Sequence, residues 1–134
     1  MKSVIEALHS VASLLIIVLV AACSAQPSGE ALLQERETLL RAACPLGSSP
    51  ENAVATLNAQ GARFVTLMSP GECQHYYANI LQKPEACAGG SRIESQILIT
   101  RSWLGIETLL LVTYLFAPDE QLVQAEYRPF YTWL

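Results

Sequence analysis

The chain carries little charge, and it lacks any cluster of charge of one sign. Eight of its 134 residues are Lys or Arg and twelve are Asp or Glu, which gives a formal net charge of −4. The basic residues stand singly along the sequence, whereas nucleic-acid-binding surfaces gather Lys and Arg in patches. The same dispersal excludes a polybasic patch for anionic lipids on the folded part. We therefore predict no nucleic-acid partner.

Residues suited to catalysis are equally scarce. Beyond Cys23 the chain has one histidine, His75, and one aspartate, Asp119. A Ser-His-Asp triad would need both, and the Gly-x-Ser-x-Gly nucleophile elbow is missing. Glu94 and Glu107 are a conceivable carboxylate pair across a hairpin, but they are more simply explained as solvent-facing charges on strands. We predict a protein that is not an enzyme and holds no cofactor.

The longest apolar run lies near the N-terminus, from Val11 to Ala22. A run this short, bounded by small residues, is typical of a secretory signal, because a membrane-spanning helix needs about 20 apolar residues. The tetrad Val20-Ala21-Ala22-Cys23 resembles a lipobox, the recognition sequence of lipoprotein signal peptidase. In such proteins the cysteine receives a diacylglycerol, the chain is cut before it, and the new amine is acylated. The resemblance implies a signal peptide over residues 1–22, a lipidated Cys23 and a tether over residues 23–29.

Two other fates of this segment stay open. An ordinary signal peptidase would cut after Ala25, and the apolar run would otherwise remain as an uncleaved anchor. Ser24 follows Cys23 at the place where enteric inner-membrane lipoproteins have Asp, which favours the outer membrane. We expect a protein held by lipid in the bacterial cell envelope, on the outer membrane and facing the periplasm.

Three cysteines follow the lipobox, in a compartment that permits disulfides. Cys73 and Cys87 are the most economical pair, since closing a loop of that length contributes about 3 kcal/mol in the chain-entropy treatment. Cys44 would then be left over, buried or paired with another chain, and a bond from Cys44 to one of the other two stays open. No metal site is expected from these residues, because Cys-x-His followed by one distant Cys is not a zinc spacing; its candidates would be Glu72, Cys73, His75 and Cys87.

Two helices are predicted before any strand. Residues 30–43 are rich in Leu, Glu, Gln, Arg and Ala, and most of the leucines fall near one face. The second helix covers residues 50–60. Ser48, with Glu51 three residues on, matches a capping box, and Gly61 suits a left-handed C-cap.

Four strands are predicted, at residues 63–68, 92–101, 106–116 and 122–131. The second and fourth alternate polar with apolar residues, as half-buried strands do. The third is almost continuously apolar, as in a central strand that is covered on both sides or lies in an interface. Residues 69–71 are expected to turn, and residues 72–91 to form a loop with one helical turn around residues 75–81. Pro129 marks the last strand as an edge. Two helices packed on one face of a three- to four-stranded antiparallel sheet give an α+β two-layer sandwich for residues 30–134.

Two segments of the chain also resemble a family. They are Leu46-Gly47-Ser48-Ser49-Pro50-Glu51-Asn52-Ala53-Val54, followed by Leu57, and Leu115-Phe116-Ala117-Pro118-Asp119-Glu120-Gln121-Leu122-Val123. Together they are similar to small outer-membrane lipoproteins of the BamE (SmpA/OmlA) type, which have a capped helix and a final hairpin of this form. A Cys-containing insert between the helix and the last strands departs from the pattern. The resemblance implies an α+β fold and a role in assembling the envelope.

Aromatic residues gather late in the chain, and core packing explains most of them. Trp103 falls in a predicted hairpin turn, and Tyr131 and Trp133 lie near the terminus, where exposed aromatics would mark a partner surface. We expect a lipoprotein that binds protein through these residues or through a sheet edge, as an assembly or scaffold factor of the envelope or of a secretion system. The alternatives are an immunity lipoprotein that neutralises a secreted toxin in the periplasm, and an inhibitor or ligand-binding lipoprotein.

Overall fold

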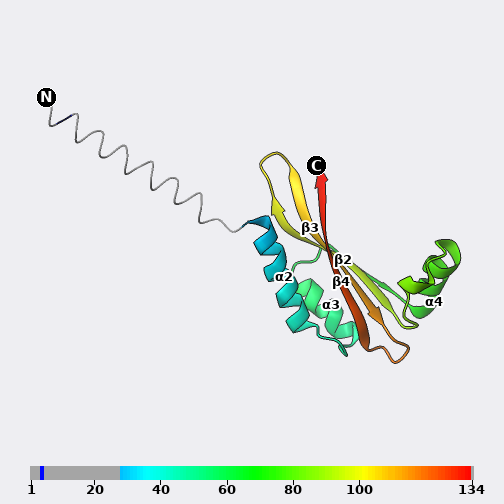
Figure 1. Ribbon diagram of the computed structural model, residues 1–134. Helices are drawn as coiled ribbons and strands as arrows, with labels where there is room; N and C mark the ends of the chain where they lie inside the picture. Colours follow the sequence, from blue (N-terminus) through cyan, green and yellow to red (C-terminus); the bar gives the residue numbers. More distant parts are fainter. Residues whose placement is uncertain (1–3, 5–27, 134) are drawn as a thin grey trace.

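The computed structural model describes Val4 and residues 28–133, so the predicted signal peptide and Cys23 lie outside the described residues. Two helices precede a four-stranded antiparallel sheet, which confirms the predicted α+β class (Figure 1). Along the chain the elements are α2 (Gly29–Ala43), α3 (Pro50–Ala59), β1 (Phe64–Met68), α4 (Pro70–Cys73), the π-helix η1 (Gln74–Ile80), the 3-10 helix η2 (Pro84–Ala86), β2 (Arg92–Arg101), β3 (Ile106–Phe116) and β4 (Leu122–Trp133). Within the described residues, no helix is both long and apolar enough to cross a membrane.

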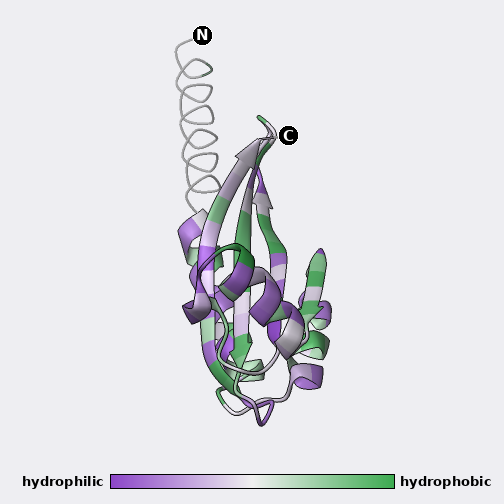
Figure 2. Cartoon of the chain, turned by 90° about the vertical axis from the view of Figure 1, so that its right-hand side faces the viewer, coloured by the Kyte–Doolittle hydropathy of each residue, from purple (hydrophilic) through white to green (hydrophobic). Residues whose placement is uncertain are grey.

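The sheet is a meander in which the strands lie in the order β1-β2-β3-β4. β3 is central, as predicted, and β4 is an edge strand, where Pro129 is tolerated. β4 continues two residues past its predicted end, because Trp133 pairs with Ile106 at the start of β3. A bulge between Leu98 and Thr100 shifts the register of β2 against β3 near the hairpin that joins them. Hydrophilic and hydrophobic bands alternate along the strands (Figure 2).

One face of the sheet packs on α2 and α3. Leu40 and Leu57 are fully buried, and they join a single cluster with the inward side chains of the sheet: Ile93, Ile97, Leu110, Val112, Tyr114 and Phe116. The hydroxyl of Tyr114 lies 3.1 Å from that of Tyr127, which gives this buried group a hydrogen-bond partner. Burying this many aliphatic and aromatic side chains is the main stabilising contribution, at about 25 cal/mol per Å² of apolar surface.

The helix starts are fixed by serine caps. Ser28 accepts a hydrogen bond from the backbone of Ala31 at 3.1 Å, and Ser49 accepts one from the backbone of Asn52 at 3.2 Å. The predicted cap at Ser48 is therefore wrong by one residue. Ser48 instead donates to the carbonyl of Pro45 at 2.7 Å, because it belongs to the turn that follows α2. Gly61, with φ of +73°, follows the helix C-cap as predicted.

Residues 70–87 form a stapled insert that is more helical than the predicted loop. A disulfide joins Cys73 to Cys87, which confirms the predicted pairing, and Cys44 is left as a free, buried thiol. The predicted turn at residues 69–71 is wrong, because Ser69 caps α4. Its hydroxyl accepts from the backbone of Glu72 at 3.2 Å, while the Glu72 carboxylate accepts from the backbone of Ser69 at 2.7 Å. This reciprocal capping box starts a helix where Ser-Pro-Gly alone suggests a turn.

Candidate functional site

The stapled insert docks on the face of the sheet that α2 and α3 leave free. Successive side chains of a strand point to opposite faces, and Ile93 faces the helices, so Arg92 and Glu94 point away from them. Tyr77, on η1, donates its hydroxyl hydrogen bond to the Glu94 carboxylate. The Arg92 guanidinium carbon lies 4.2 Å from the centre of the Tyr77 ring, and Arg92 also donates to the carbonyl of Ala86 at 2.7 Å. These contacts hold the insert against the start of β2.

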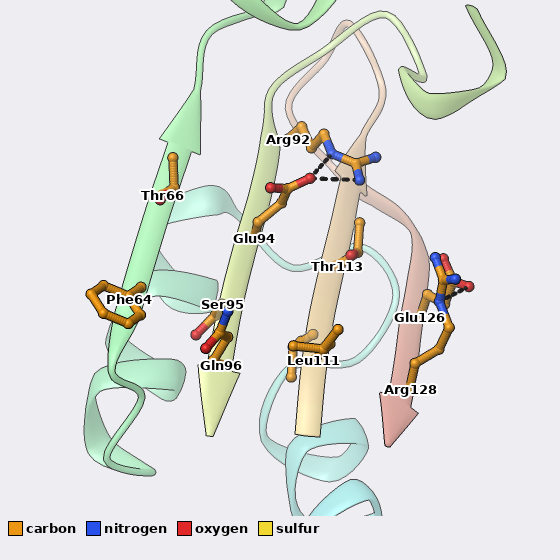
Figure 3. Close-up of a pocket in the computed structure, with 11 residues that line it drawn as sticks. Phe64, Thr66, Arg92, Glu94, Ser95, Gln96, Leu111, Thr113, Glu126 and Arg128 are labelled. Atoms are coloured by element: carbon orange, nitrogen blue, oxygen red, sulfur yellow. Dashed lines mark hydrogen bonds and ion pairs between the residues drawn. The ribbon is translucent and has the colours of Figure 1, made fainter. Parts of the chain in front are cut away.

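Beside the insert, this helix-free face is hollowed into a groove, which we call the sheet groove. Two hollows of about 310 and 270 Å³ adjoin each other there. They share four lining residues, which are Arg92, Thr113, Glu126 and Arg128. All four strands contribute side chains to the larger hollow (Figure 3). The smaller hollow is bounded by Tyr77, Lys83, Glu85 and Ala86 of the insert, so the sheet forms the floor and the insert forms one wall.

The floor of the sheet groove mixes paired charges with apolar surface. Arg92 and Glu94 form an ion pair at 2.8 Å, and so do Arg128 and Glu126 at 2.8 Å. Phe64, on β1, is 64% exposed although it is a large aromatic side chain, and it lies on the same face. Balanced ion pairs make the groove a poor site for a single small ion. An exposed aromatic residue and arginines are, in contrast, characteristic of protein–protein interfaces.

Glu107 is not the solvent-facing charge that the sequence predicts. It is 1% exposed and forms ion pairs with Arg63 at 2.8 Å and with Arg101. The two guanidinium groups, Arg63 first, hold the pKa of Glu107 at about 2, well below its ordinary value. The bulge in β2 explains this arrangement, because an extra residue moves Arg101 onto the face that carries Glu107.

Glu94 and Glu107 do not form a catalytic carboxylate pair. Glu94 pairs in register with Thr113, so six residues of β3, or about 20 Å of strand, separate it from Glu107. Glycosidases need two carboxyl groups within about 10 Å of each other. The structure therefore gives these two glutamates separate roles, one beside the insert and one in a buried ion-pair network.

The other conceivable reactive groups are not assembled into a site. His75 is exposed on η1, and Asp119 accepts a hydrogen bond from the backbone of Gln121 at 3.2 Å in the β3–β4 turn. Cys73 and Cys87, two of the four candidate metal ligands, are joined in a disulfide and so have no thiolate to offer a metal ion. No group of three or more metal-binding side chains gathers anywhere in residues 28–133. Cys44 is a buried free thiol, and its burial raises the pKa of that thiol.

The aromatic residues expected to bind a partner lie at the end of the sheet, away from the stapled insert. Trp103 is 92% exposed, Tyr131 is 63% exposed and Trp133 is 73% exposed. Trp103 occupies the β2–β3 turn, while Tyr131 and Trp133 end β4. They form a surface of their own, distinct from the sheet groove.

Sequence reasoning missed the sheet groove, although part of its signal was present. In β2 and β4, polar residues alternate with apolar ones, and the polar positions of both strands share one face of the sheet. They are Arg92, Glu94 and Gln96 on β2, and Glu126 and Arg128 on β4. The position of the insert beside this face could not be predicted from the sequence, because it depends on contacts of the Tyr77 hydroxyl and of Arg92.

Comparison of the chain with protein-family models, with curated proteins and with solved structures finds no match to any of them.

Proposed function

We propose that this protein is a lipid-anchored protein of the bacterial envelope that works by binding another protein in the sheet groove. The anchor is supported by the lipobox-like tetrad Val20-Ala21-Ala22-Cys23. The envelope location is supported by the Cys73–Cys87 disulfide, since such bonds persist in oxidising compartments. The outer membrane is the proposed site of the anchor, because Ser24 follows the lipidated residue.

The sheet groove carries the binding part of the proposal. The helices leave this face of the sheet free, and the insert forms a wall beside it, which makes the surface concave. The Cys73–Cys87 disulfide limits the conformational freedom of that wall. Phe64 offers an apolar anchor on it, and Arg128, whose side chain is 69% exposed, offers a charged contact. Rigid surfaces bind with less loss of conformational entropy, which favours a docking role for this face.

Binding, and not catalysis, is the proposed activity. The charged groups on the floor of the groove neutralise each other in pairs, Arg92 with Glu94 and Arg128 with Glu126. Such pairing favours recognition of a polypeptide with both polar and apolar side chains. An assembly partner, as the BamE-type resemblance implies, and a secreted toxin would both fit this description. The genes next to this one would separate the two, because an immunity protein is expected beside its toxin.

Site-specific photocrosslinking in cells tests the groove. A photoreactive residue is placed at Phe64 or at Arg128 in the groove, and at Thr38, which is exposed on α2, as the matched control. We expect one covalent adduct of the same size from both groove positions and none from Thr38. Adducts from Thr38 alone, or from none of the three positions, would contradict the proposed binding face.

A further inference from the structure

The end of the sheet at the β2–β3 turn carries an aromatic tip, by which we mean Trp103, Leu104, Tyr131 and Trp133. All four side chains are more than half exposed, from 58% for Leu104 to 92% for Trp103. Trp133 pairs in register with Ile106, directly after the turn, so the end of β4 lies beside it. Both views place this turn and the end of β4 together at one end of the molecule (Figures 1 and 2).

The turn that carries Trp103 and Leu104 is held by its own hydrogen bonds. The backbone N–H of Ser102 donates to the carbonyl of Ile106 at 2.8 Å, and the N–H of Gly105 donates to the carbonyl of Ser102 at 3.1 Å. Gly105 has φ of +82°, a conformation that glycine adopts without strain. Residues 102–105 include no charged side chain. The two apolar side chains are thus presented in a fixed, uncharged turn.

The aromatic tip lies at the end of the molecule where α2 begins, and the proposed anchor, Cys23, precedes α2 in the sequence. Leu32, in the first turn of α2, lines the same hollow as Ile99, which is three residues before the β2–β3 turn. Figures 1 and 2 place the start of α2 and the tip at the same end, with the tip reaching further. Ser28 is the fifth residue after Cys23, so the two are at most about 18 Å apart even when the chain is fully extended. A lipidated Cys23 therefore keeps this end of the domain close to the bilayer.

We propose that the aromatic tip inserts into the lipid–water interface of the membrane that holds Cys23. Trp and Tyr favour this region because their rings are apolar and their N–H and O–H groups remain hydrated. The uncharged turn adds Leu104 to the contact and avoids the cost of desolvating a charge. The inference rests on the lipid anchor of the proposed function. It assigns Trp103, Tyr131 and Trp133 to lipid, and leaves the protein partner to the sheet groove.

Insertion of the aromatic tip would also orient the domain on the membrane. The stapled insert contacts Arg92 at the start of β2, and the tip follows the end of the same strand. Ten strand residues, about 33 Å, lie between them. With the tip in the membrane interface, the insert wall of the sheet groove faces away from the membrane, where a partner can reach it.

Tryptophan fluorescence tests this directly, because the only two tryptophans of the chain are Trp103 and Trp133. The full lipidated protein is reconstituted in phospholipid vesicles, with and without brominated lipid as a quencher. Trp133→Phe leaves Trp103 as the single reporter, and Trp103→Phe leaves Trp133. The matched control carries Leu46→Trp in a chain without the two natural tryptophans. Leu46 is 68% exposed and follows the far end of α2, about 22 Å from its start.

We expect blue-shifted emission and strong quenching by brominated lipid for both tip reporters, and neither effect for the control. Emission at the wavelength of exposed tryptophan without quenching would overturn the inference. So would a blue shift without quenching, because it would indicate contact with protein instead of lipid. Radiolabelled palmitate incorporation is measured on the same protein. A labelled chain with an unquenched tip overturns this inference alone, whereas a chain without label overturns the lipid anchor and, with it, the inference.

Discussion

Removing the disulfide is the perturbation whose magnitude follows most directly from the structure. The bond between Cys73 and Cys87 spans a sequence separation of 14 residues. In the chain-entropy treatment, opening a loop of this length lowers the free energy of unfolding by about 3 kcal/mol at 25 °C. We therefore expect the double variant Cys73→Ala/Cys87→Ala to lose about 3 kcal/mol in denaturant unfolding followed by circular dichroism. The insert should also become more sensitive to proteases, since no covalent bond then joins Cys73 to Cys87, and non-covalent contacts such as those of Tyr77 and Arg92 must order it.

The matched control for this variant is Cys44→Ala, which removes a buried thiol that no disulfide uses. The control should leave the insert as resistant to proteases as in the wild type. A loss below about 1 kcal/mol in the double variant, with no change in proteolysis, would contradict a stabilising role for this disulfide. It would mean that the disulfide does not limit the freedom of the unfolded insert.

Three further changes have expected outcomes. Leu57→Ala should destabilise the protein by about 3 kcal/mol in denaturant unfolding, because the fully buried side chain leaves a cavity; a loss near zero would contradict the described core. Ser95→Ala should stabilise it by about 1 kcal/mol, because the buried hydroxyl of Ser95 has no hydrogen-bond partner among the described residues; destabilisation would reveal a missing partner. Glu107→Gln should lower the melting temperature at neutral pH, because Arg63 and Arg101 stabilise the ionised carboxylate. Since the pKa of Glu107 falls from 4.5 to about 2 on folding, this stabilisation is present above pH 4.5 and disappears as the pH falls to about 2. A difference in melting temperature that persists at low pH would argue against the ion-pair network.

The fold was largely predictable because its elements depend on local patterns. The three long strands were predicted from the pattern of polar and apolar residues, because a strand with one buried face alternates them with a period of two. The alternation marks residues 92–101 and 122–131, and a continuous apolar run marks residues 106–116. The errors arose where two local signals compete. Ser48 and Ser49 are both able to cap a helix, and the choice between them depends on the turn after α2. The Ser-Pro-Gly segment that begins at residue 69 is typical of a turn. The hydrogen bond from the backbone of Ser69 to the Glu72 carboxylate makes it the start of a helix instead.

The candidate site was less predictable because it depends on contacts across the sheet. The ion pair of Glu107 with Arg101 depends on a bulge in β2, and no residue near Leu98 predicts that bulge. The sheet groove exists because the insert lies over one face, which is decided by the contacts of Tyr77 and Arg92. The disulfide was predictable from spacing, and the exposure of Trp103 from its place in a hairpin turn.

The proposed lipid anchor at Cys23 is open to a direct test by fatty-acid labelling. Cells that express the wild type, Cys23→Ser or the control Cys44→Ser are grown with labelled palmitate, and the purified proteins are compared. We expect label on the wild type and on Cys44→Ser, and none on Cys23→Ser. Label that persists on Cys23→Ser, or is absent from the wild type, would contradict the proposed anchor.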